Sequence, residues 1–588
     1  MNDRQLMRLI PLVLIATTWA VYAAGLNAPF LFDDKHHIVE NLQIRSLWPP
    51  GNVVRGSTRP VIYYSLAVNY ALDELNPRGY RAANVAIHIA AGLFLFGILR
   101  RTLDLRSQPD SNRATGTYAA AAIALLWLVH PLQTGSVTYV IQRCESLMGM
   151  FFLGTLYFTL RASASEAKRR WYAAALLFYL LGMFCKQVMV TAPLVILLYD
   201  RTFLSLSWRR AFQLRGWLYA AMFAVVPLVV YRELTVPPDG NASAGFHIQS
   251  VTWWEYLRTQ PGGLLHYLKL CFWPRELCFD YKWPVADSWI QIALPGTILT
   301  AALGGGLWGV LRGSRVGFLV VACFVILAPT SSIMPIQDLA FEHRMYLPLA
   351  CVLTLAAVGV GQLASFVLAG PRRRGWAIGT VAAVTAFLAS ITMERNRLYN
   401  DPAEMWLHAA RLAPHNDRAF CNAGLVRFEN GQVIPAIALF KKAIEVNPKN
   451  AIAQYNLGYA QFMLGDAFAA RRSIVRAYDA DPSFALPRLQ LAWMLATSHD
   501  ESVRNGALAV TMMKNELRQY GESAAVYDIL AAAFAETGDF ANACKAAQLA
   551  QRFARSEQRP KLAAAIASRL EQYRHQQPHR CRLVRVAT

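Results

Sequence analysis

The sequence lacks paired cysteines and is poor in charge. Its nine cysteines stand singly in 588 residues, with no Cys-x-x-Cys pair, so neither a disulfide framework nor a cysteine-based zinc site is indicated. Only 16% of the residues are charged, whereas 55% are hydrophobic. This balance excludes a disordered chain, and it excludes a protein that is soluble over its whole length.

Acidic residues are outnumbered by basic ones. The chain has 37 Asp and Glu against 58 Lys and Arg, which gives a formal net charge of +21. Most of the excess lies in the first 400 residues, which are largely apolar. In such a region, clustered Lys and Arg mark cytoplasmic loops of a membrane protein. We therefore expect a lipid bilayer around the chain and no nucleic-acid partner.

The first 400 residues contain many apolar runs of roughly the 17–25 residues that cross a bilayer. We predict eleven spans, near 7–26, 84–99, 116–132, 145–160, 171–185, 187–200, 216–231, 288–311, 316–333, 345–370 and 375–392. Residues 253–273 are a further candidate. Because Arg258, His266 and Lys269 interrupt that run, we predict an interfacial helix there.

Basic clusters predict the orientation of the spans. They are Arg4/Arg8, Arg100/Arg101/Arg106, Lys168/Arg169/Arg170, Arg209/Arg210/Arg215, Arg312/Arg315 and Arg372/Arg373/Arg374. With eleven spans, all six lie on the side of the N-terminus, which the positive-inside rule places in the cytoplasm. The part after the last span then lies outside. We expect a multi-pass membrane protein with a cytoplasmic N-terminus and a C-terminal part outside, and a solvated Asp200 on the cytoplasmic side.

A period of 34 residues is visible beyond residue 394. The matched positions are Gly424 and Gly458, Gly431 and Gly465, Ala436 and Ala470, Ala443 and Ala477, and Pro448 and Pro482. Small residues let the two helices of a hairpin approach closely, and proline ends the second helix. The pattern resembles the tetratricopeptide repeat, with clear copies at 417–450 and 451–484 and a degenerate copy at 527–550. The concave face of such arrays usually binds peptide.

These patterns together predict an all-α protein in three parts. Residues 1–393 form a polytopic helical membrane domain with outer loops at 27–83 and 232–287. Residues 394–575 form a tetratricopeptide-repeat α-solenoid. Residues 576–588, rich in His, Gln and Arg, form a disordered tail.

An acidic pair, Asp33 and Asp34, directly follows an apolar stretch in the first outer loop. Carboxylates just outside the bilayer could deprotonate a hydroxyl, or hold a divalent cation such as Mg²⁺ or Mn²⁺. A helix N-cap followed by a polar loop explains the same residues without any chemistry.

Cationic groups are predicted on the same outer face. Arg143 precedes the fourth span, Lys186 separates the fifth from the sixth, and Glu342, His343 and Arg344 stand before the tenth. The planar fork of arginine suits phosphate, so these groups suggest a site for an anionic lipid head group beside a hydroxyl. Interfacial snorkelling and simple packing are the structural alternatives.

A series of short motifs occurs in a fixed order along the chain. They are Asp33-Asp34, Arg59-Pro60, Asn69-Tyr70, Pro77, Asn84, His88, His130-Pro131, Arg143, Lys186, Leu277-Cys-Phe-Asp280-Tyr281, Glu342 and Tyr346-Leu347-Pro348, followed by the repeats. The series resembles the transmembrane and tetratricopeptide-repeat protein O-mannosyltransferases, and more broadly the polyprenyl-phosphate-sugar-dependent glycosyltransferases of the C superfamily. The short array suggests a bacterial member, which implies a place in the cytoplasmic (inner) membrane with the repeats in the periplasm.

The resemblance implies that a sugar moves from a polyprenyl-phosphate donor to Ser or Thr of a protein that the repeats recruit, with inversion at the anomeric carbon. One carboxylate of the acidic pair, with Asp34 favoured over Asp33, would be the base. Lys186, Arg143, Arg344 and His343 would contact the donor phosphate. Supporting residues would be Glu342, Arg59 and His88, although a lone histidine in an apolar span more often serves packing.

The sequence departs from the family pattern at two places. Lys186 stands in Cys-Lys-Gln, where the family typically has Ser-Lys-Glu, and His343 separates Glu342 from Arg344. Two other functions stay open. The acceptor could be an envelope glycan or lipid, or the chain could be a membrane-anchored scaffold without enzymatic activity whose repeats gather partners.

Overall fold

The chain folds into two compact units, Met1–Pro402 and Ala403–Thr588. We call them the membrane unit and the repeat unit. The computed structural model describes residues 3–105, 113–235, 244–246, 248, 250–367 and 370–581. Over these residues the regular elements are helices, and one isolated bridge joins Ala244 to Ile336. The predicted boundary at 393 falls inside a helix that continues to Leu398.

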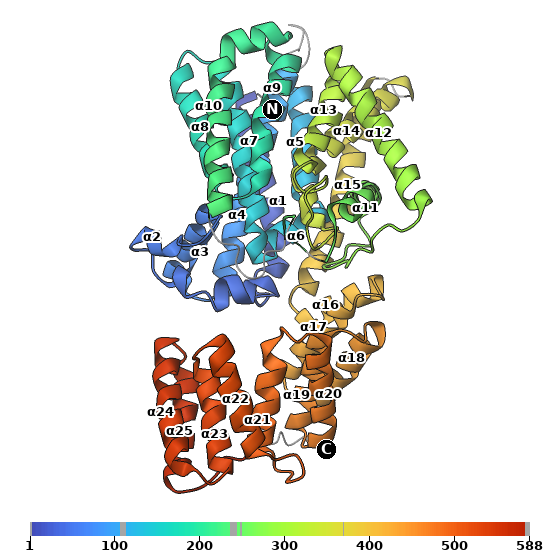
Figure 1. The fold of residues 1–588 in the computed structure, drawn as a ribbon. Helices are drawn as coiled ribbons and strands as arrows, with labels where there is room; N and C mark the ends of the chain where they lie inside the picture. Colours follow the sequence, from blue (N-terminus) through green and yellow to red (C-terminus); the bar gives the residue numbers. More distant parts are fainter. Residues whose placement is uncertain are drawn as a thin grey trace. The chain divides into compact units, whose positions relative to one another are not determined.

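The membrane unit is built from apolar helices of different lengths (Figure 1). They are α1 (Asp3–Tyr22), α4 (Pro77–Asp104), α5 (Arg113–Leu128), α7 (Arg143–Ser163), α8 (Lys168–Met183), α9 (Ala192–Tyr199), α10 (Trp208–Thr235), α12 (Trp289–Leu311), α13 (Arg315–Leu327), α14 (Pro348–Val367) and α15 (Gly370–Leu398). Each predicted span overlaps one of them. Among the described residues, seven helical segments are long and apolar enough to cross a membrane, or eight with the bent pair Ala114–Leu128 and Pro131–Val137. The chain is thus a multi-pass membrane protein, and the number eleven stays a prediction.

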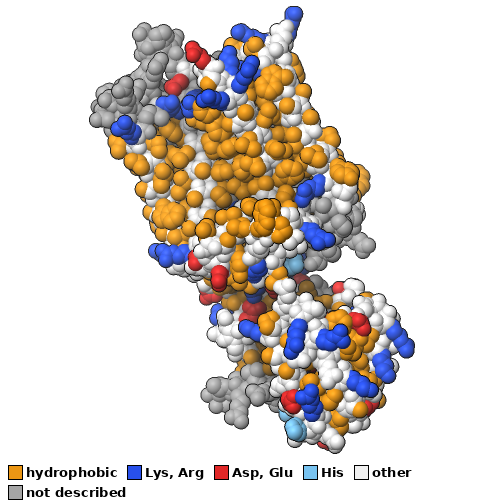
Figure 2. Space-filling view, turned by 90° about the vertical axis from the view of Figure 1, so that its left-hand side faces the viewer, with side chains coloured by type: hydrophobic (Ala, Val, Ile, Leu, Met, Phe, Trp, Pro, Cys, Tyr) orange, Lys and Arg blue, Asp and Glu red, His pale blue; other side chains and the backbone are white. Residues whose placement is uncertain are grey.

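The surface of the membrane unit is apolar over a wide area. Figure 2 shows hydrophobic side chains spread across one face of this unit, with Lys and Arg toward its margins. Exposed examples are Trp217 and Phe223 on α10 and Leu294 and Ile298 on α12. A continuous apolar surface of this kind needs a lipid environment, and its helices satisfy their own backbone groups.

Further helices lie between these along the chain. They are α2 (Pro50–Val53), α3 (Pro60–Asp73), α6 (Thr134–Val137) and α11 (Trp253–Phe272). A capping box of Thr252 and Glu255 starts α11, the segment predicted as an interfacial helix. The helix is not among the spans that pass the length and hydropathy criteria, and its buried side includes Tyr256 and Tyr267.

The expectation for Asp200 was wrong. Its side chain is fully buried and accepts hydrogen bonds from Arg215 at 2.8 Å, from Tyr219 at 2.6 Å and from Ser205 at 2.6 Å. The partners come from the start of α10 and the turn before it, so the carboxylate links that turn to the helix. A buried charge is tolerated because it is paired and fully hydrogen-bonded.

The repeat unit is a series of paired helices. They are α16 (Pro402–Leu412), α17 (Asp417–Glu429), α18 (Val433–Val446), α19 (Ala451–Met463), α20 (Ala467–Ala480), α21 (Ala485–Thr497), α22 (Gly506–Tyr520), α23 (Ala524–Glu536), α24 (Phe540–Ser556) and α25 (Pro560–Arg574). The two clear predicted copies are the pairs α17–α18 and α19–α20. A β-carbon at Gly424 would come within 2.7 Å of Phe440, and one at Gly458 within 2.8 Å of Ile474. The periodic glycines therefore permit close packing within each pair.

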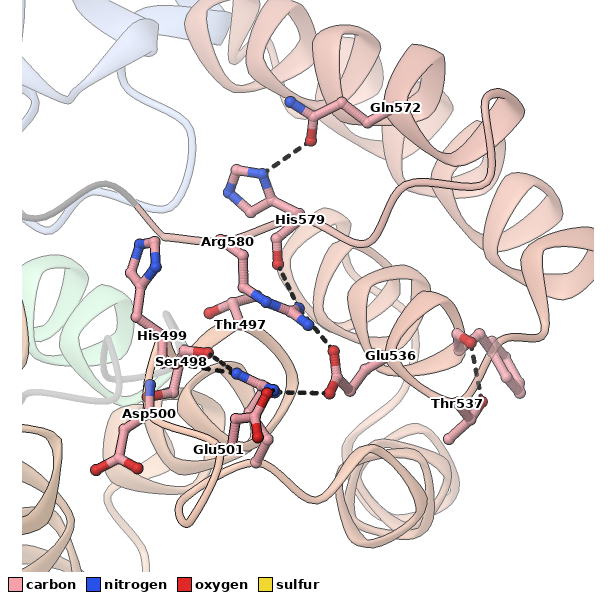
Figure 3. A network of polar contacts seen from close by, with 12 residues as sticks. Thr497, Ser498, His499, Asp500, Glu501, Glu536, Thr537, Gln572, His579 and Arg580 are labelled. Atoms are coloured by element: carbon pink, nitrogen blue, oxygen red, sulfur yellow. Dashed lines mark hydrogen bonds and ion pairs between the residues drawn. The ribbon is translucent and has the colours of Figure 1, made fainter.

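The predicted disordered tail begins with an ordered stretch. Residues 576–581 lie against the repeat helices through Cys581, Arg580 and His579 (Figure 3). Residues 582–588, the remainder of that prediction, lie outside the described residues.

Candidate functional site

Asp34 is buried within the protein. Its Oδ2 accepts the backbone N–H of Leu31 at 3.1 Å and its Oδ1 accepts that of Ile141 at 2.8 Å. The side chain has no exposed surface. Burial raises the pKa of this carboxyl to about 7, although the two backbone donors and the nearby Arg81 oppose the shift. Oδ1 of Asp34 thus ties the first outer loop to the segment before α7, and Oδ2 closes a turn within the loop.

Asp33 has a different environment. Its side chain is only half-buried, and its backbone N–H donates to the hydroxyl of Tyr139 at 3.0 Å. The Asp33 carboxylate also contributes, after burial, to raising the pKa of that Tyr139 hydroxyl. The preceding Phe32 has a φ of 42°, a conformation that costs a bulky residue roughly 1–2 kcal/mol. Strain of this kind beside a partly exposed carboxylate favours Asp33 over Asp34 as the reactive group.

Lys186 is held by an acid that the sequence analysis missed. Its Nζ forms an ion pair with Oε1 of Glu145, in the first turn of α7. The same Glu145 oxygen lies 3.9 Å from Nε2 of His343. The side chains of Lys186 and His343 are each 12% exposed, against 3% for Glu145. The two basic groups therefore share one buried carboxylate and keep a small accessible surface.

The loop that carries His343 is fixed against α7 by a close approach. Gly149 lies one turn after Glu145, and a β-carbon there would clash with the Tyr346 ring. Residues one turn apart share a helix face. Because Gly149 admits Tyr346, His343 is placed beside Glu145 on that same face.

A further cation, Arg59, lies near this cluster. Burial lowers the pKa of His343 well below its ordinary value, and Lys186, Arg344 and Arg59 add to the shift. His343 is therefore neutral near pH 7 and can offer a hydrogen bond but no charge. Within the described part of the chain, the half-buried Arg59 guanidinium has no hydrogen-bond or ion-pair partner.

Arg143 does not fit the predicted role of a phosphate ligand. Its guanidinium is 1% exposed and donates to Oδ1 of Asn84 at 2.6 Å, to the carbonyl of Tyr80 at 2.9 Å and to the carbonyl of Ser65 at 3.1 Å. These acceptors belong to α3 and α4. Arg143 thus fixes the start of α7 to two neighbouring helices, and its donors are already used.

Arg344 is engaged in a similar way. It donates to the carbonyls of Leu339 at 3.0 Å and Asp338 at 2.7 Å, and to the hydroxyl of Tyr256 at 3.1 Å. Arg344 is 7% exposed. The structure therefore favours a role in closing the loop before the 3₁₀ turn Glu342–Met345 and in holding α11, in place of the predicted phosphate contact.

Glu342 and His88 hold the segments around the site in place through buried contacts. Glu342 pairs with Arg395 of α15 at 3.0 Å and accepts from the hydroxyl of Tyr281 at 2.7 Å. His88 is fully buried, with Nδ1 2.9 Å from the Tyr346 hydroxyl and Nε2 3.0 Å from the carbonyl of Leu128. Glu342 is 4% exposed and His88 is fully buried, and both hold neighbouring segments in place.

The acidic pair lacks the surroundings of a metal site. Among the described residues, no group of three or more His, Cys, Asp or Glu side chains is placed to hold a metal ion. Both Asp34 oxygens are used by backbone donors. The arrangement thus gives no support to Asp33 and Asp34 as ligands of Mg²⁺ or Mn²⁺.

One segment, Tyr139–Glu145, connects the acidic and basic groups. Tyr139 contacts Asp33, Ile141 binds Asp34, and Glu145 binds Lys186. Glu145 and Arg395, the partners missed by sequence reasoning, each carry one weak signal: an ionisable residue inside or at the edge of an apolar run is costly and needs a partner. Chemically, Lys186, Arg59 and the neutral His343 imidazole suit an anion, and the separate, half-buried Asp33 carboxylate suits a proton.

Fold and site together define a multi-pass helical membrane protein with a helical-repeat unit. The TPR repeat family matches residues 424–465. Protein O-mannosyl-transferase TMTC3 is 22% identical over 537 residues in both Mus musculus and Homo sapiens, covering 83% of this chain and 56% of the relative. Protein O-mannosyl-transferase Tmtc1 of Drosophila melanogaster is 24% identical over 339 residues, covering 51% of this chain and 37% of the relative. The chain spans about half the length of the TMTC3 proteins.

A solved structure also resembles this chain. It is ArnT from Cupriavidus metallidurans bound to undecaprenyl phosphate, with 17% sequence identity and a TM-score of 0.38. The match covers 82% of this chain and 79% of that one.

Proposed function

We propose that the chain is a membrane glycosyltransferase that moves a hexose from a polyprenyl-phosphate donor to Ser or Thr of a protein. The observation that carries the proposal is the convergence of Lys186, Glu145 and His343, with Arg59 beside them. A lipid phosphate needs such a partly buried cationic site at the membrane edge. The names of the relatives, protein O-mannosyl-transferases, support the sugar-transfer class and favour mannose.

The proposed reaction uses one carboxylate and the basic cluster. Asp33 accepts the proton of the acceptor hydroxyl while the oxygen of that hydroxyl bonds to the anomeric carbon. The bond from that carbon to the phosphate oxygen breaks on the opposite side, so the configuration inverts. Polyprenyl phosphate leaves with the bond's electron pair, and Lys186 and Arg59 stabilise the charge that develops on it. No oxidant or further reactant is required.

The tetratricopeptide repeats would bring the acceptor protein to the enzyme, because peptide is the usual ligand of such arrays. In this proposal the site and the repeat unit share the outer face of a bacterial cytoplasmic membrane. The odd number of predicted spans and the side of the basic clusters support that orientation.

Reconstitution tests the proposal. Purified full-length protein in vesicles is given a polyprenyl-phosphate hexose and either a Ser/Thr-rich protein or an envelope glycan, and the products are weighed by mass spectrometry. A hexose added to Ser or Thr supports the proposal. If the hexose is added only to the glycan, the acceptor is a glycan and not a protein. If the donor stays intact with every acceptor, the result favours a scaffold without enzymatic activity.

A further inference from the structure

The chain folds back onto its own repeats after α25. Gln576 reverses the direction with a φ of 56°, and the following residues lie across helices of the repeat unit (Figure 3). His579 donates from Nδ1 to Oε1 of Gln572 at 3.0 Å. Arg580 forms an ion pair with Glu536 at 2.6 Å.

Backbone contacts hold the same segment. The N–H of Cys581 donates to the carbonyl of Thr497 at 3.1 Å, and its carbonyl accepts from Nε2 of His499 at 2.7 Å. Such a pair of main-chain bonds does not depend on the side chain of the bound residue. Extended peptides are usually bound through main-chain hydrogen bonds of this kind, and contacts of the neighbouring side chains supply the selectivity.

The residues that contact the docked segment belong to helices that are far apart in sequence. Trp493 and Thr497 belong to α21, Glu536 ends α23 and Gln572 lies on α25. The Trp493 ring lies 5.7 Å from the His579 ring. The guanidinium of Arg569 also lies over this ring, 5.4 Å from its centroid.

The last residue of the segment, Cys581, contacts apolar residues. Cys581 packs against the buried cluster that contains Phe462 and Met494. Successive residues of the segment thus meet an aromatic ring, a carboxylate and an apolar patch. This defines three adjacent subsites with different chemistry.

Amide side chains extend the site along the repeats. Asn422, Asn456 and Gln490 recur at the 34-residue period. Nε2 of Gln490, a residue that is 8% exposed, and Nδ2 of Asn422 have no hydrogen-bond partner among the described residues. Gln490 lies one turn before Trp493 on the same face of α21. These donors are suited to the carbonyl groups of a peptide longer than the docked segment.

We propose that helices α21, α23 and α25 form a groove for an extended basic peptide of a partner protein, and that Gln576–Cys581 occupies this groove until such a peptide displaces it. The motif that fits is a His or aromatic residue, then Arg, then a small apolar residue. Glu536 favours an arginine through charge attraction: its Oε1 accepts from Nε of Arg504 at 2.8 Å, whereas its Oε2 is left to pair with the guanidinium of the docked segment at 2.6 Å. The proposal concerns binding only and holds whatever reaction the membrane unit performs.

Tethering makes the docked segment a strong competitor. A short flexible connection gives an effective concentration of roughly millimolar. A free peptide with the same contacts must therefore compete at a large disadvantage in the intact chain. Removing the segment, or its arginine contact, is expected to open the groove.

Fluorescence anisotropy with a labelled, capped peptide of the sequence Gln576–Cys581 tests this, using detergent-solubilised protein without donor lipid. A chain that ends at His575, and the full chain carrying Arg580→Glu, are both expected to bind the peptide at least about tenfold more tightly than the unaltered chain. Arg574→Glu is the matched control, since Arg574 pairs with the exposed Glu571. It is expected to leave binding unchanged.

The charge subsite is tested without altering the protein fold. A labelled peptide with Arg580→Glu is expected to bind the shortened chain at least about tenfold more weakly than the native peptide. Equal binding of the two peptides, or equal binding by the shortened and unaltered chains, would overturn the proposal. Because no sugar donor is present, neither result bears on glycosyl transfer.

Discussion

Lys186 and Glu145 form an ion pair between the start of α7 and the turn that follows α8. The Glu145 side chain is 3% exposed and that of Lys186 is 12% exposed, so in the proposed reaction Lys186 keeps the surface through which a phosphate can be reached. In that proposal, the pair fixes the position of the lysine and leaves part of its side chain accessible to the donor phosphate.

Lys186→Met is expected to reduce transfer by about 100-fold or more and to lower thermal stability, because removing one partner of a buried pair typically costs about 3–5 kcal/mol. The double variant Lys186→Met with Glu145→Gln removes the unpaired charge. We expect it to regain melting temperature without regaining transfer. Recovery of transfer in the double variant would mean that Lys186 serves the fold alone.

Arg143 is expected to act through the fold. Arg143→Lys cannot reproduce the bonds to Asn84, Tyr80 and Ser65, and hydrogen bonds of a charged group contribute roughly 1.5–3 kcal/mol each. We predict a drop of several degrees in melting temperature and an unchanged KM for the lipid donor in the protein that remains folded. A large rise in donor KM at unchanged stability would restore the phosphate-binding role.

The buried Asp34 predicts a pH dependence of stability. Its pKa is raised to about 7, so the folded protein binds this proton more tightly than the unfolded chain. Its stabilising contribution is therefore fully present in acid and is lost as the pH rises from about 4 through about 7. In Asp34→Asn this part of the pH dependence should disappear from melting curves recorded between pH 4 and 8. Parallel curves for the two proteins would contradict the assignment.

The division between the units predicts where the repeats can be removed. Arg395 pairs with Glu342, and Asn396 binds the hydroxyl of Thr138 at 2.6 Å and the carbonyl of Val21 at 3.1 Å. A chain ending at Pro402 keeps these contacts, whereas one ending at residue 393 loses them. We expect the longer variant to transfer sugar to a short Ser/Thr peptide but at least about tenfold less to a whole protein acceptor. Undiminished transfer to the protein would show that the repeats do not recruit it.

The sequence predicted most of the helical architecture because apolar runs and a 34-residue period are local signals. It failed where burial depends on partners distant in sequence. The acceptors of Arg143 lie 59 to 78 residues away, and Glu342 meets Arg395 across 53 residues. No local pattern distinguishes the buried Asp34 from the half-buried Asp33, since only the backbone donors at Leu31 and Ile141 decide it.

The central claim is that Asp33 acts as the base in transfer from a polyprenyl-phosphate hexose, and the rate of Asp33→Asn in reconstituted vesicles tests it most directly. We predict a loss of about 100- to 10,000-fold, with release of polyprenyl phosphate falling in parallel and the melting temperature unchanged. Asp34→Asn, measured beside it, should mainly lose stability. Transfer by Asp33→Asn at the unaltered rate would contradict the account.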